Sequence, residues 1–293
     1  MGIIHLYFMN KKILLIGKTS YIGINLEKRL QKNNNIILIS PSSKECNLLD
    51  FRSVSLYIKN IKLIDSLVCL AVIKKNKNNN FFDFLNNIKM TINVLRIINR
   101  SKCKHVLFTS TTDIYGKNPA LPINENNKFK VDTYYNTSKF ISEKLFLLSS
   151  KILKFSLSIF RIPGVYGYNH KDRSVVHQLI KKVINNEEIN INNLKNIKRD
   201  YLYIDDLCKL IEISINKRIN ILVNVVSGRS ITLNKIATTI FEVFEKKTNI
   251  KYNYSDDRSF SLDFDNKKLM KIFNYKFMNF EDVIEQYKNF YRK

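Results

Sequence analysis

The alternation of short apolar runs with longer amphipathic runs constrains the fold of this chain more than any other feature of its sequence. The short runs are rich in β-branched residues and too continuously apolar for strands with one exposed face. The longer runs place apolar residues three and four apart, which is typical of helices. Right-handed crossovers would join these elements into a doubly wound parallel sheet of the α/β class. The expected strands are residues 13–16, 36–39, 67–71, 105–109, 155–160 and 221–225, and the main expected helices are 21–31, 81–100 and 133–151.

The regular alternation weakens after Gly167, where Asn- and Lys-rich segments separate shorter runs such as 175–184. A chain of 293 residues is long enough for one large α/β domain and a smaller lobe. We therefore expect residues 1–166 to form the sheet-bearing domain and residues 167–293 mainly the C-terminal lobe, with about 200–228 returning to the sheet. Residues 1–10 are interpreted as an extension, with Met9 as the functional start.

The chain is strongly basic, with 49 Lys and Arg residues against 25 Asp and Glu residues and a formal charge of +24. The lysines are interspersed with Asn and Ile along the whole chain instead of forming one stripe, and no nucleic-acid module accompanies them. We therefore expect no nucleic-acid partner. The positive field would still favour an anionic small molecule such as a diphosphate.

The cysteines and the N-terminus bear on location. The four cysteines are widely spaced and form no CxxC pair, so they indicate neither a disulfide framework nor a metal site and suit a reducing compartment. The apolar residues 3–9 lack the preceding positive charge and the small-residue cleavage site of a signal peptide. Leu6 stands where a myristoylation signal requires Ser or Thr. We therefore expect a cytoplasmic chain that is not bound to a membrane.

A turn containing two glycines, residues 17–23, lies between the first expected strand and the first expected helix. A dinucleotide pyrophosphate needs a tight turn, a close backbone approach and the free N–H groups of a helix N-terminus. Gly17 and Gly23 meet these needs, but Ser20 stands where the pattern GxxGxxG has its middle glycine. The turn is also compatible with an ordinary connection between a strand and a helix, so its interpretation depends on other residues.

Tyr135 and Lys139 lie four residues apart in an expected helix and therefore on one face of it, about 5–6 Å from each other. A nearby ammonium group favours the phenolate and lowers a tyrosine pKa from about 10 toward the working pH. During hydride transfer to a ketone, such a phenol can donate the proton that the alkoxide needs, and Thr111 is a candidate for a second hydroxyl that holds it. The same pair is also typical of an amphipathic helix surface.

The ordered set of segments resembles the extended short-chain dehydrogenases, also called the NAD-dependent epimerase/dehydratase family, from about Lys12 to the C-terminus. The sequence departs from the family pattern at several positions, where Asn47 replaces an Asp, Cys69 replaces a His, and Gly164 replaces the Asn that contacts the substrate. The resemblance implies a Rossmann-type domain followed by a smaller, substrate-binding C-terminal lobe. The similar segments are 47–50, 65–72, 87–95, 110–116, 135–143, 161–167, 199–206 and 224–228.

The resemblance also assigns roles to individual residues. It implies that Thr111, Tyr135 and Lys139 are catalytic. It implies that the substrate contacts are Thr111, Thr112, Asp113, Gly164 and Arg199, the last holding a diphosphate through a bidentate guanidinium unless it is an ordinary surface arginine. Together with the glycine turn, the implied cofactor contacts are Gly17, Thr19, Ser20, Tyr21, Ile22, Gly23, Ser40, Ser42, Lys44, Asn47, Leu48, Leu70, Ala71, Val72, Asn87, Thr109, Tyr135, Lys139, Pro163 and Val165.

The end of the second expected strand bears on the choice of cofactor. An acid there would bind the adenosine ribose of NAD, whereas small or basic residues leave room for a 2′-phosphate. Residues 40–44, with the sequence Ser-Pro-Ser-Ser-Lys, contain no acid. NADP is therefore favoured over NAD, with Ser42, Ser43 and Lys44 as candidate phosphate contacts, and a solvated Lys44 is the alternative.

The short path from the second strand to Asp50 resembles the reductases of 4-keto-6-deoxysugar nucleotides. The resemblance therefore implies reduction of a nucleotide-diphosphate sugar at C4, in the biosynthesis of a surface polysaccharide. A 4-epimerase needs no catalytic group beyond the three named above and is the alternative. A 4,6-dehydratase is favoured less, because Thr112 replaces an Asp used in the elimination of water, although Asp113 could supply one carboxylate.

Two further expectations concern partners and class. The family resemblance implies a homodimer that forms through the helices 81–100 and 133–151. The alternative from another class is a non-catalytic relative that binds a dinucleotide as a sensor or as an interaction module.

Overall fold

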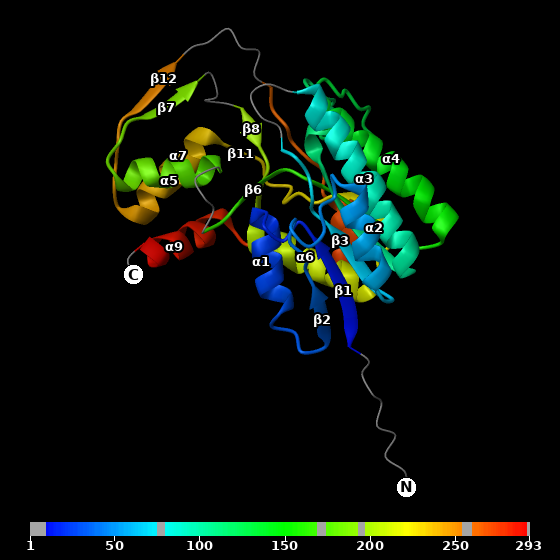
Figure 1. The fold of residues 1–293 in the computed structure, drawn as a ribbon. Helices are drawn as coiled ribbons and strands as arrows, with labels where there is room; N and C mark the ends of the chain where they lie inside the picture. Colours follow the sequence, from blue (N-terminus) through cyan, green and yellow to red (C-terminus); the bar gives the residue numbers. More distant parts are fainter. Residues whose placement is uncertain (1–9, 75–79, 169–173, 193–196, 254–259, 292–293) are drawn as a thin grey trace. The chain divides into compact units, whose positions relative to one another are not determined.

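A computed structural model describes residues 10–74, 80–168, 174–192, 197–253 and 260–291. The expected N-terminal extension lies almost entirely outside the described residues. Over the first half of the chain, strands and helices alternate as the sequence predicts (Figure 1).

The central element is a six-stranded sheet with the strand order β10-β5-β4-β3-β1-β2. β1 pairs in parallel with both β2 and β3, and β3 pairs in parallel with β4. The expected doubly wound parallel sheet is therefore confirmed, and each of the six expected strands is present. Their bounds are β1 Lys11–Ile16, β2 Ile36–Ile39, β3 Ser66–Cys69, β4 His105–Thr111, β5 Ser156–Ile162 and β10 Ile221–Asn224.

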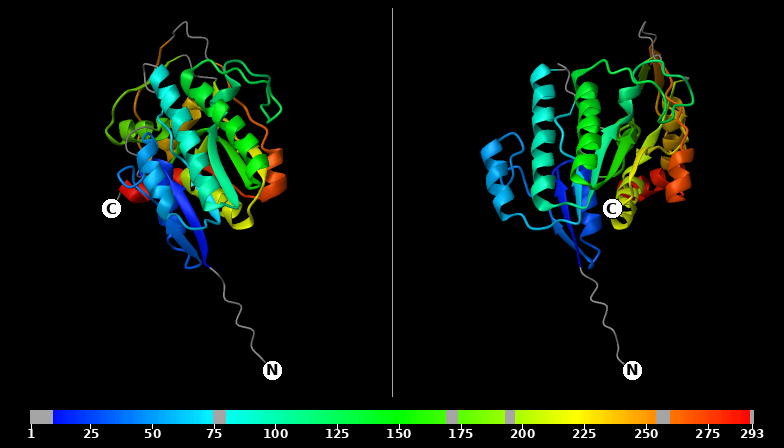
Figure 2. Two further views of the ribbon diagram at one scale, coloured as in Figure 1. Left: turned by 45° about the vertical axis from the view of Figure 1, so that its right-hand side comes forward. Right: turned by 90° about the vertical axis from the view of Figure 1, so that its right-hand side faces the viewer.

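Helices flank this sheet at the expected places. α1 spans Tyr21–Leu30, α3 spans Phe81–Ser101 and α4 spans Tyr134–Leu153. α3 and α4 lie side by side (Figure 2), and the hydroxyls of Thr91 and Ser142 are 2.8 Å apart between them. A further helix, α2 (Phe51–Asn60), was not predicted; it begins after Asp50, whose carboxylate caps its N-terminus.

The buried side chains of the strands form the core against α3 and α4. Leu14, Leu67, Val106 and Ile159 have no exposed surface. The ring of Phe108 packs on that of Phe146 from α4, with ring centres 4.7 Å apart. Burial of these strands on both faces explains their continuously apolar sequences.

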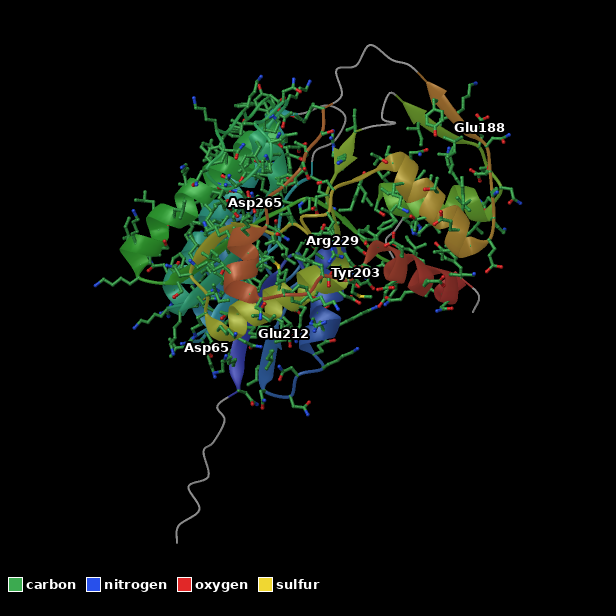
Figure 3. The ribbon with its side chains drawn as sticks, turned by 180° about the vertical axis from the view of Figure 1, so that it is seen from behind. Asp65, Glu188, Tyr203, Glu212, Arg229 and Asp265 are labelled. Atoms are coloured by element: carbon green, nitrogen blue, oxygen red, sulfur yellow. The ribbon has the colours of Figure 1, made fainter. Side chains whose placement is uncertain are left out.

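The chain divides into two compact units. The first unit consists of Met1–Ser110, Asp132–Phe160 and Ile211–Leu222, and the second of Thr111–Val131, Arg161–Leu210 and Val223–Lys293. Within the first unit, the segment 211–222 is attached through an ion pair of 2.8 Å between Arg29 and Glu212 and one of 2.9 Å between Arg218 and Asp65. Figure 3 labels Glu212 and Asp65. The domain boundaries expected from the sequence stay a prediction.

The second unit contains short strand pairs and helices. β6 (Gly164–Tyr166) pairs in parallel with β9 (Tyr201–Tyr203), β8 (Lys198–Arg199) pairs antiparallel with β11 (Ile231–Thr232), and β7 (Ile189–Asn192) pairs in parallel with β12 (Ile250–Asn253). Its other elements are the 3-10 helix η1 (Thr112–Tyr115), α5 (Val175–Ile184), α7 (Leu233–Phe244), α8 (Lys267–Phe273) and α9 (Phe280–Tyr291), while α6 (Ile204–Lys217) continues into the first unit. Among the described residues, the helices lack an apolar stretch that could cross a bilayer.

Candidate active site

The glycine turn after β1 packs tightly against the residues that follow β3. Gly17 has a φ of +96°, and a Cβ atom on it would lie 2.8 Å from the nitrogen of Ala71. A Cβ atom on Gly23 would lie 2.3 Å from the carbonyl oxygen of Gly17. Both positions therefore exclude any side chain, and this cradle has the close backbone approach that a dinucleotide needs.

Ser20 replaces the missing glycine by capping the helix that follows. Its hydroxyl donates to the carbonyl oxygen of Gly17 at 2.8 Å and accepts from the N–H of Gly23 at 3.0 Å. A serine at this position is a favourable N-cap, so α1 still begins immediately after the turn. The N-terminus of α1 thus faces the loop that would hold a pyrophosphate.

The serines after β2 already donate to carboxylates. The hydroxyl of Ser40 donates to Glu27 of α1 at 2.5 Å. The N–H and the hydroxyl of Ser42 both donate to one oxygen of Glu45, at 2.7 and 2.8 Å. These hydrogen bonds from Ser42 lower the pKa of Glu45, and the charge of Lys18 in the glycine turn adds to the effect.

Asn87 holds the backbone beyond β3 in place. Its amide oxygen accepts from the N–H of Ile73 at 2.8 Å, and its amide nitrogen donates to the carbonyl oxygen of Ile73 at 3.1 Å. The same nitrogen donates to the hydroxyl of Ser138 in α4 at 3.3 Å. Asn87 is buried, so it connects the segment after Val72 with the helix that carries the expected catalytic pair.

Lys139 is a buried cation at the carboxyl end of β4. Its ammonium group donates to the carbonyl oxygen of Thr109 at 2.7 Å. Burial lowers its pKa to about 8, while the neighbouring Cys69 and Glu143 act in the opposite direction. Tyr135 lies one helical turn earlier and is partly exposed, and its backbone oxygen accepts from Ser138 at 2.7 Å.

Other cofactor candidates of the first unit differ in burial and in their contacts. Leu48 is buried, and its carbonyl oxygen accepts from Asn93 of α3 at 2.8 Å. Asn47 is exposed and its side chain accepts from the N–H of Leu49 at 3.0 Å. Leu70 is buried, whereas the side chains of Thr19 and Lys44 are exposed to solvent.

The second unit carries the expected substrate contacts. Thr111 is the last residue of β4, and its hydroxyl accepts from the N–H of Asp113 at 3.1 Å, which caps η1. Thr111 and Thr112 are buried, and Asp113 is exposed. In β6, Gly164 pairs with Tyr201. Tyr135 and Lys139 belong to the first unit, so their assembly with Thr111 into one site stays a prediction.

Arg199 is held by backbone oxygens of the second unit. Its guanidinium donates to the carbonyl oxygen of Lys198 at 3.0 Å and to that of Phe260, and it lies 5.1 Å from the centre of the Phe260 ring. Burial lowers its pKa, while Tyr201 and Asp113 raise it. This partly buried, oriented guanidinium differs from a fully solvated surface arginine.

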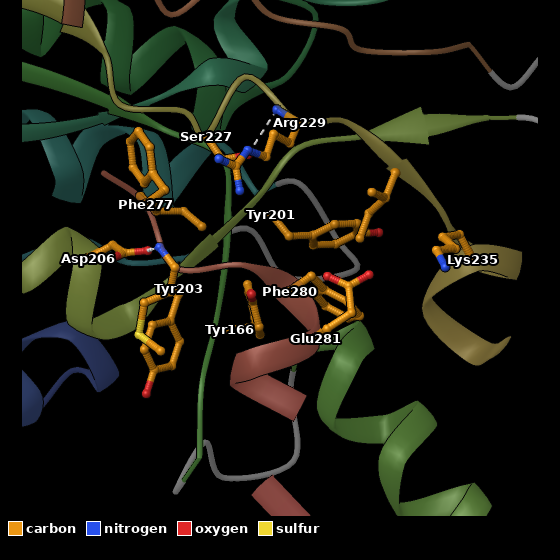
Figure 4. A pocket seen from close by; sticks show the side chains of 13 residues that line it. Tyr166, Tyr201, Tyr203, Asp206, Ser227, Arg229, Lys235, Phe277, Phe280 and Glu281 are labelled. Carbon is orange, nitrogen blue, oxygen red and sulfur yellow. Dashed lines mark hydrogen bonds between the residues drawn. The ribbon is translucent and has the colours of Figure 1, made fainter. Parts of the chain in front are cut away.

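A cavity of about 220 Å³ lies within the second unit (Figure 4). It is bounded on one side by the loop that contains Ser227 and Arg229. In this loop the N–H groups of Ser227 and Gly228 donate to the buried carboxylate of Asp200 at 3.0 and 2.9 Å. Burial raises the pKa of Asp200 to about 6. The lining residues are Tyr166, Tyr201, Leu202, Tyr203, Asp206, Ser227, Arg229, Ile231, Lys235, Phe277, Met278, Phe280 and Glu281.

Residues 13–225 match the model of the NAD dependent epimerase/dehydratase family. The chain belongs to this family. The resemblance inferred from the sequence is therefore confirmed, and an NAD(P) cofactor is expected for members of the NAD dependent epimerase/dehydratase family. The glycine cradle beside Ala71 fits such a cofactor.

The relatives of the chain are named for different reactions. It is 25% identical to a putative UDP-glucose 4-epimerase from Methanocaldococcus jannaschii over 76% of this chain and 79% of that protein. It is 28% identical to a dTDP-4-dehydro-6-deoxyglucose reductase from Escherichia coli over 64% of this chain and 61% of that protein. The fold is similar to that of a GDP-mannoheptose C4 reductase from Campylobacter jejuni with NADP bound, with a TM-score of 0.85, 17% identity and coverage of 97% and 99% of the two chains.

Sequence reasoning missed residues around the dinucleotide cradle of this epimerase/dehydratase family member. The N–H and the hydroxyl of Ser42 both donate to Glu45, and the three-residue spacing of this pair was visible in the sequence. Glu27 lies in a different element from Ser40, so nothing in the sequence indicated their contact. The bond between Asn87 and Ser138 likewise joins two helices.

Proposed function

We propose that this protein reduces a 4-keto-6-deoxysugar nucleotide at C4 with NAD(P)H. The observation that carries the proposal is the buried ammonium of Lys139, one turn from Tyr135 in a helix beside the end of β4. A lysine charge is retained inside a protein mainly where it has a partner or a chemical task. The relative from Escherichia coli with a reductase name supports reduction over epimerisation.

Tyr135, Lys139 and Thr111 have different roles in the proposed reaction. When bound, a nicotinamide supplies the hydride. Tyr135 donates a proton to the sugar oxygen as negative charge develops on it, and the Lys139 ammonium favours the phenolate that remains. The hydroxyl of Thr111 accepts from the N–H of Asp113, so its own proton can be donated to the same sugar oxygen.

The substrate diphosphate is assigned to Arg199. Its guanidinium is partly fixed by backbone oxygens, so little side-chain freedom is lost when it binds two phosphate oxygens. Thr112, Asp113 and Gly164 are the proposed neighbours of the sugar. We place the reaction in the cytoplasm, in the biosynthesis of a deoxysugar for a surface polysaccharide.

NADP is the proposed cofactor. Ser42 directs two hydrogen-bond donors at one negatively charged oxygen, which is the arrangement that a 2′-phosphate requires. The solved reductase from Campylobacter jejuni contains NADP. The carboxylates of Glu27 and Glu45 oppose a phosphate at this place.

A homodimer through α3 and α4 is also proposed. Apolar side chains on these helices are exposed, among them Leu85 at 44% and Ile92 at 49%. They belong to a mostly apolar groove of about 350 Å³ that Phe51 and Ile141 also line. An apolar surface of this kind is typical of an interface between subunits.

The test is NADPH consumption in the presence of 4-keto-6-deoxysugar nucleotides. We expect oxidation of NADPH that depends on the sugar and is lost in Tyr135→Phe. If Tyr135→Phe left every rate unchanged, the proposed chemistry would be wrong, and a dinucleotide-binding module without catalysis would explain the binding that remained.

A 4-epimerase is the second candidate, because the relative from Methanocaldococcus jannaschii has that name. It needs the same three catalytic residues. It would interconvert C4 epimers of a nucleotide sugar without net consumption of NAD(P)H, so sugar analysis in the same assay separates the two reactions. A dehydratase would instead release a 4-keto-6-deoxy product from an unmodified nucleotide hexose.

A further inference from the structure

In the loop after β2, the carboxylate of Glu45 occupies hydrogen-bond donors of the same loop. Ser42 directs its backbone N–H and its hydroxyl at the same oxygen of Glu45, at 2.7 and 2.8 Å. Lys18, from the glycine turn, stabilises the negative charge of that carboxylate. Two donors and a nearby cation thus surround one carboxylate oxygen, and such a set binds phosphate oxygens equally well.

The position of these donors in the fold relates them to the binding of the cofactor. In doubly wound sheets, the adenosine ribose of a dinucleotide lies beside the end of the second strand, next to the glycine turn. β2 ends at Ile39, and Ser40 and Ser42 follow within three residues. Ser40 already donates to Glu27. Ser42 has two donors, its N–H and its hydroxyl, that could bind a group on the ribose.

We propose that Glu45 competes with the 2′-phosphate of NADP for the two donors of Ser42 and so sets the balance between NADP and NAD. The inference rests on the proposed function, because it requires that a dinucleotide binds at the glycine turn. NADP has to displace the carboxylate and approach it against like charge. NAD leaves Glu45 in place, and its 2′-hydroxyl can donate to that carboxylate.

Glu45→Gln is the informative variant, because the glutamine amide oxygen can still accept from Ser42 and the loop keeps its shape. The variant should bind 2′,5′-ADP about five- to tenfold more tightly than the unmodified protein, since a charged competitor is replaced by a neutral one. Its affinity for 5′-ADP, which lacks the 2′-phosphate, should change less than about twofold.

The affinities are measured by isothermal titration calorimetry and repeated with NADPH and NADH, so turnover is not needed. Glu188→Gln, at an exposed position of the second unit, is the control for the loss of one negative charge. Ser42→Ala should weaken the binding of 2′,5′-ADP, because it removes one of the two donors.

The outcomes separate this inference from the function on which it rests. Equal gains for 2′,5′-ADP and 5′-ADP in Glu45→Gln, or the same gain in Glu188→Gln, would overturn the role of Glu45 while leaving dinucleotide binding intact. If the unmodified protein bound none of the four ligands, the proposed function would fail and the role of Glu45 with it.

Discussion

The ammonium group of Lys139 is bonded to the backbone oxygen of Thr109 at 2.7 Å, and its nitrogen lies 4.8 Å from the centre of the Phe108 ring. The lysine is only 4% exposed. Its pKa falls to about 8 because burial disfavours the charged form. The fold thus contains a cation that destabilises it, as proteins do when a charge serves their chemistry.

Lys139→Met should therefore lower turnover and raise thermal stability at neutral pH. We expect a loss of about 100-fold or more in kcat, the range for removal of a group that supports acid–base catalysis. The melting temperature should rise, because a neutral side chain of similar length is less costly to bury. Calorimetry and steady-state kinetics measure both quantities. A variant that is less stable as well as less active would mean that Lys139 is mainly structural.

The titration of Lys139 should change both kcat/KM and the free energy of unfolding, each in a defined direction. Lys139 is charged below about pH 8 and loses its proton above it, so kcat/KM should fall as the pH rises through that value. Between about pH 8 and the ordinary lysine pKa of 10.5, the unfolded chain binds more protons than the folded one. The contribution of Lys139 to the free energy of unfolding should therefore rise with pH in this window. Urea titrations at several pH values should show it as a difference in unfolding free energy between the unmodified protein and Lys139→Met that grows with pH, because the other titrating groups are common to both proteins.

His105 should make the protein sensitive to mild acid. It is fully buried, its Nε2 lies 3.2 Å from the hydroxyl of Ser158, and burial lowers its pKa from 6.5 to about 4. Between these values the unfolded chain takes up a proton that the folded chain does not. Stability should fall by about 3 kcal/mol as the pH drops from 6.5 to 4. The difference between the unmodified protein and His105→Gln, followed by urea unfolding, isolates this contribution, and parallel pH profiles would contradict it.

Gly23→Ala should damage the glycine turn. The new Cβ atom would meet the Gly17 carbonyl oxygen at 2.3 Å, so the turn has to move. We expect a loss of stability of about 2–4 kcal/mol and of dinucleotide binding. Gly164→Ala is the matched control for stability, because its Cβ atom would meet only the Tyr201 ring at an ordinary 3.6 Å. Equal melting temperatures for the two variants would contradict the tight packing of the turn.

The proposed dimer predicts a change of mass on substitution in α3. Ile92→Glu places a charge in an apolar interface and should produce monomers in light-scattering measurements. Leu63→Glu, an exposed apolar position between α2 and β3, should leave the mass unchanged. A single mass equal to one chain for the unmodified protein at high concentration would rule out the dimer.

The strands and long helices could be predicted from the sequence because their signals are local. Continuous apolar runs and spacings of three and four residues located the six strands of the sheet to within two residues at each end. α2 was missed although Asp50 is a typical N-cap, because residues 47–50 were interpreted as a cofactor segment and the run that follows is short.

The residue types of the candidate site could be named from the sequence, whereas most of their contacts could not. Gly17 and Gly23 could be inferred from their place between strand and helix. The partner of Lys139 lies 30 residues earlier in the chain, and Arg199 meets a backbone oxygen 61 residues later. Such pairs depend on how the elements pack, which no local pattern encodes. Ser42 and Glu45 are only three residues apart, so their contact could have been inferred from the sequence. It was overlooked because only residues 40–44 were considered for an acid.

The bonds of Asn87 have a consequence for how a dinucleotide would bind. Its amide fixes both polar atoms of the Ile73 backbone and also reaches Ser138. The backbone after Val72, where we propose that the dinucleotide binds, is therefore held in place before any ligand arrives. Association should need little rearrangement there, so most of the entropy lost on binding would come from the dinucleotide itself.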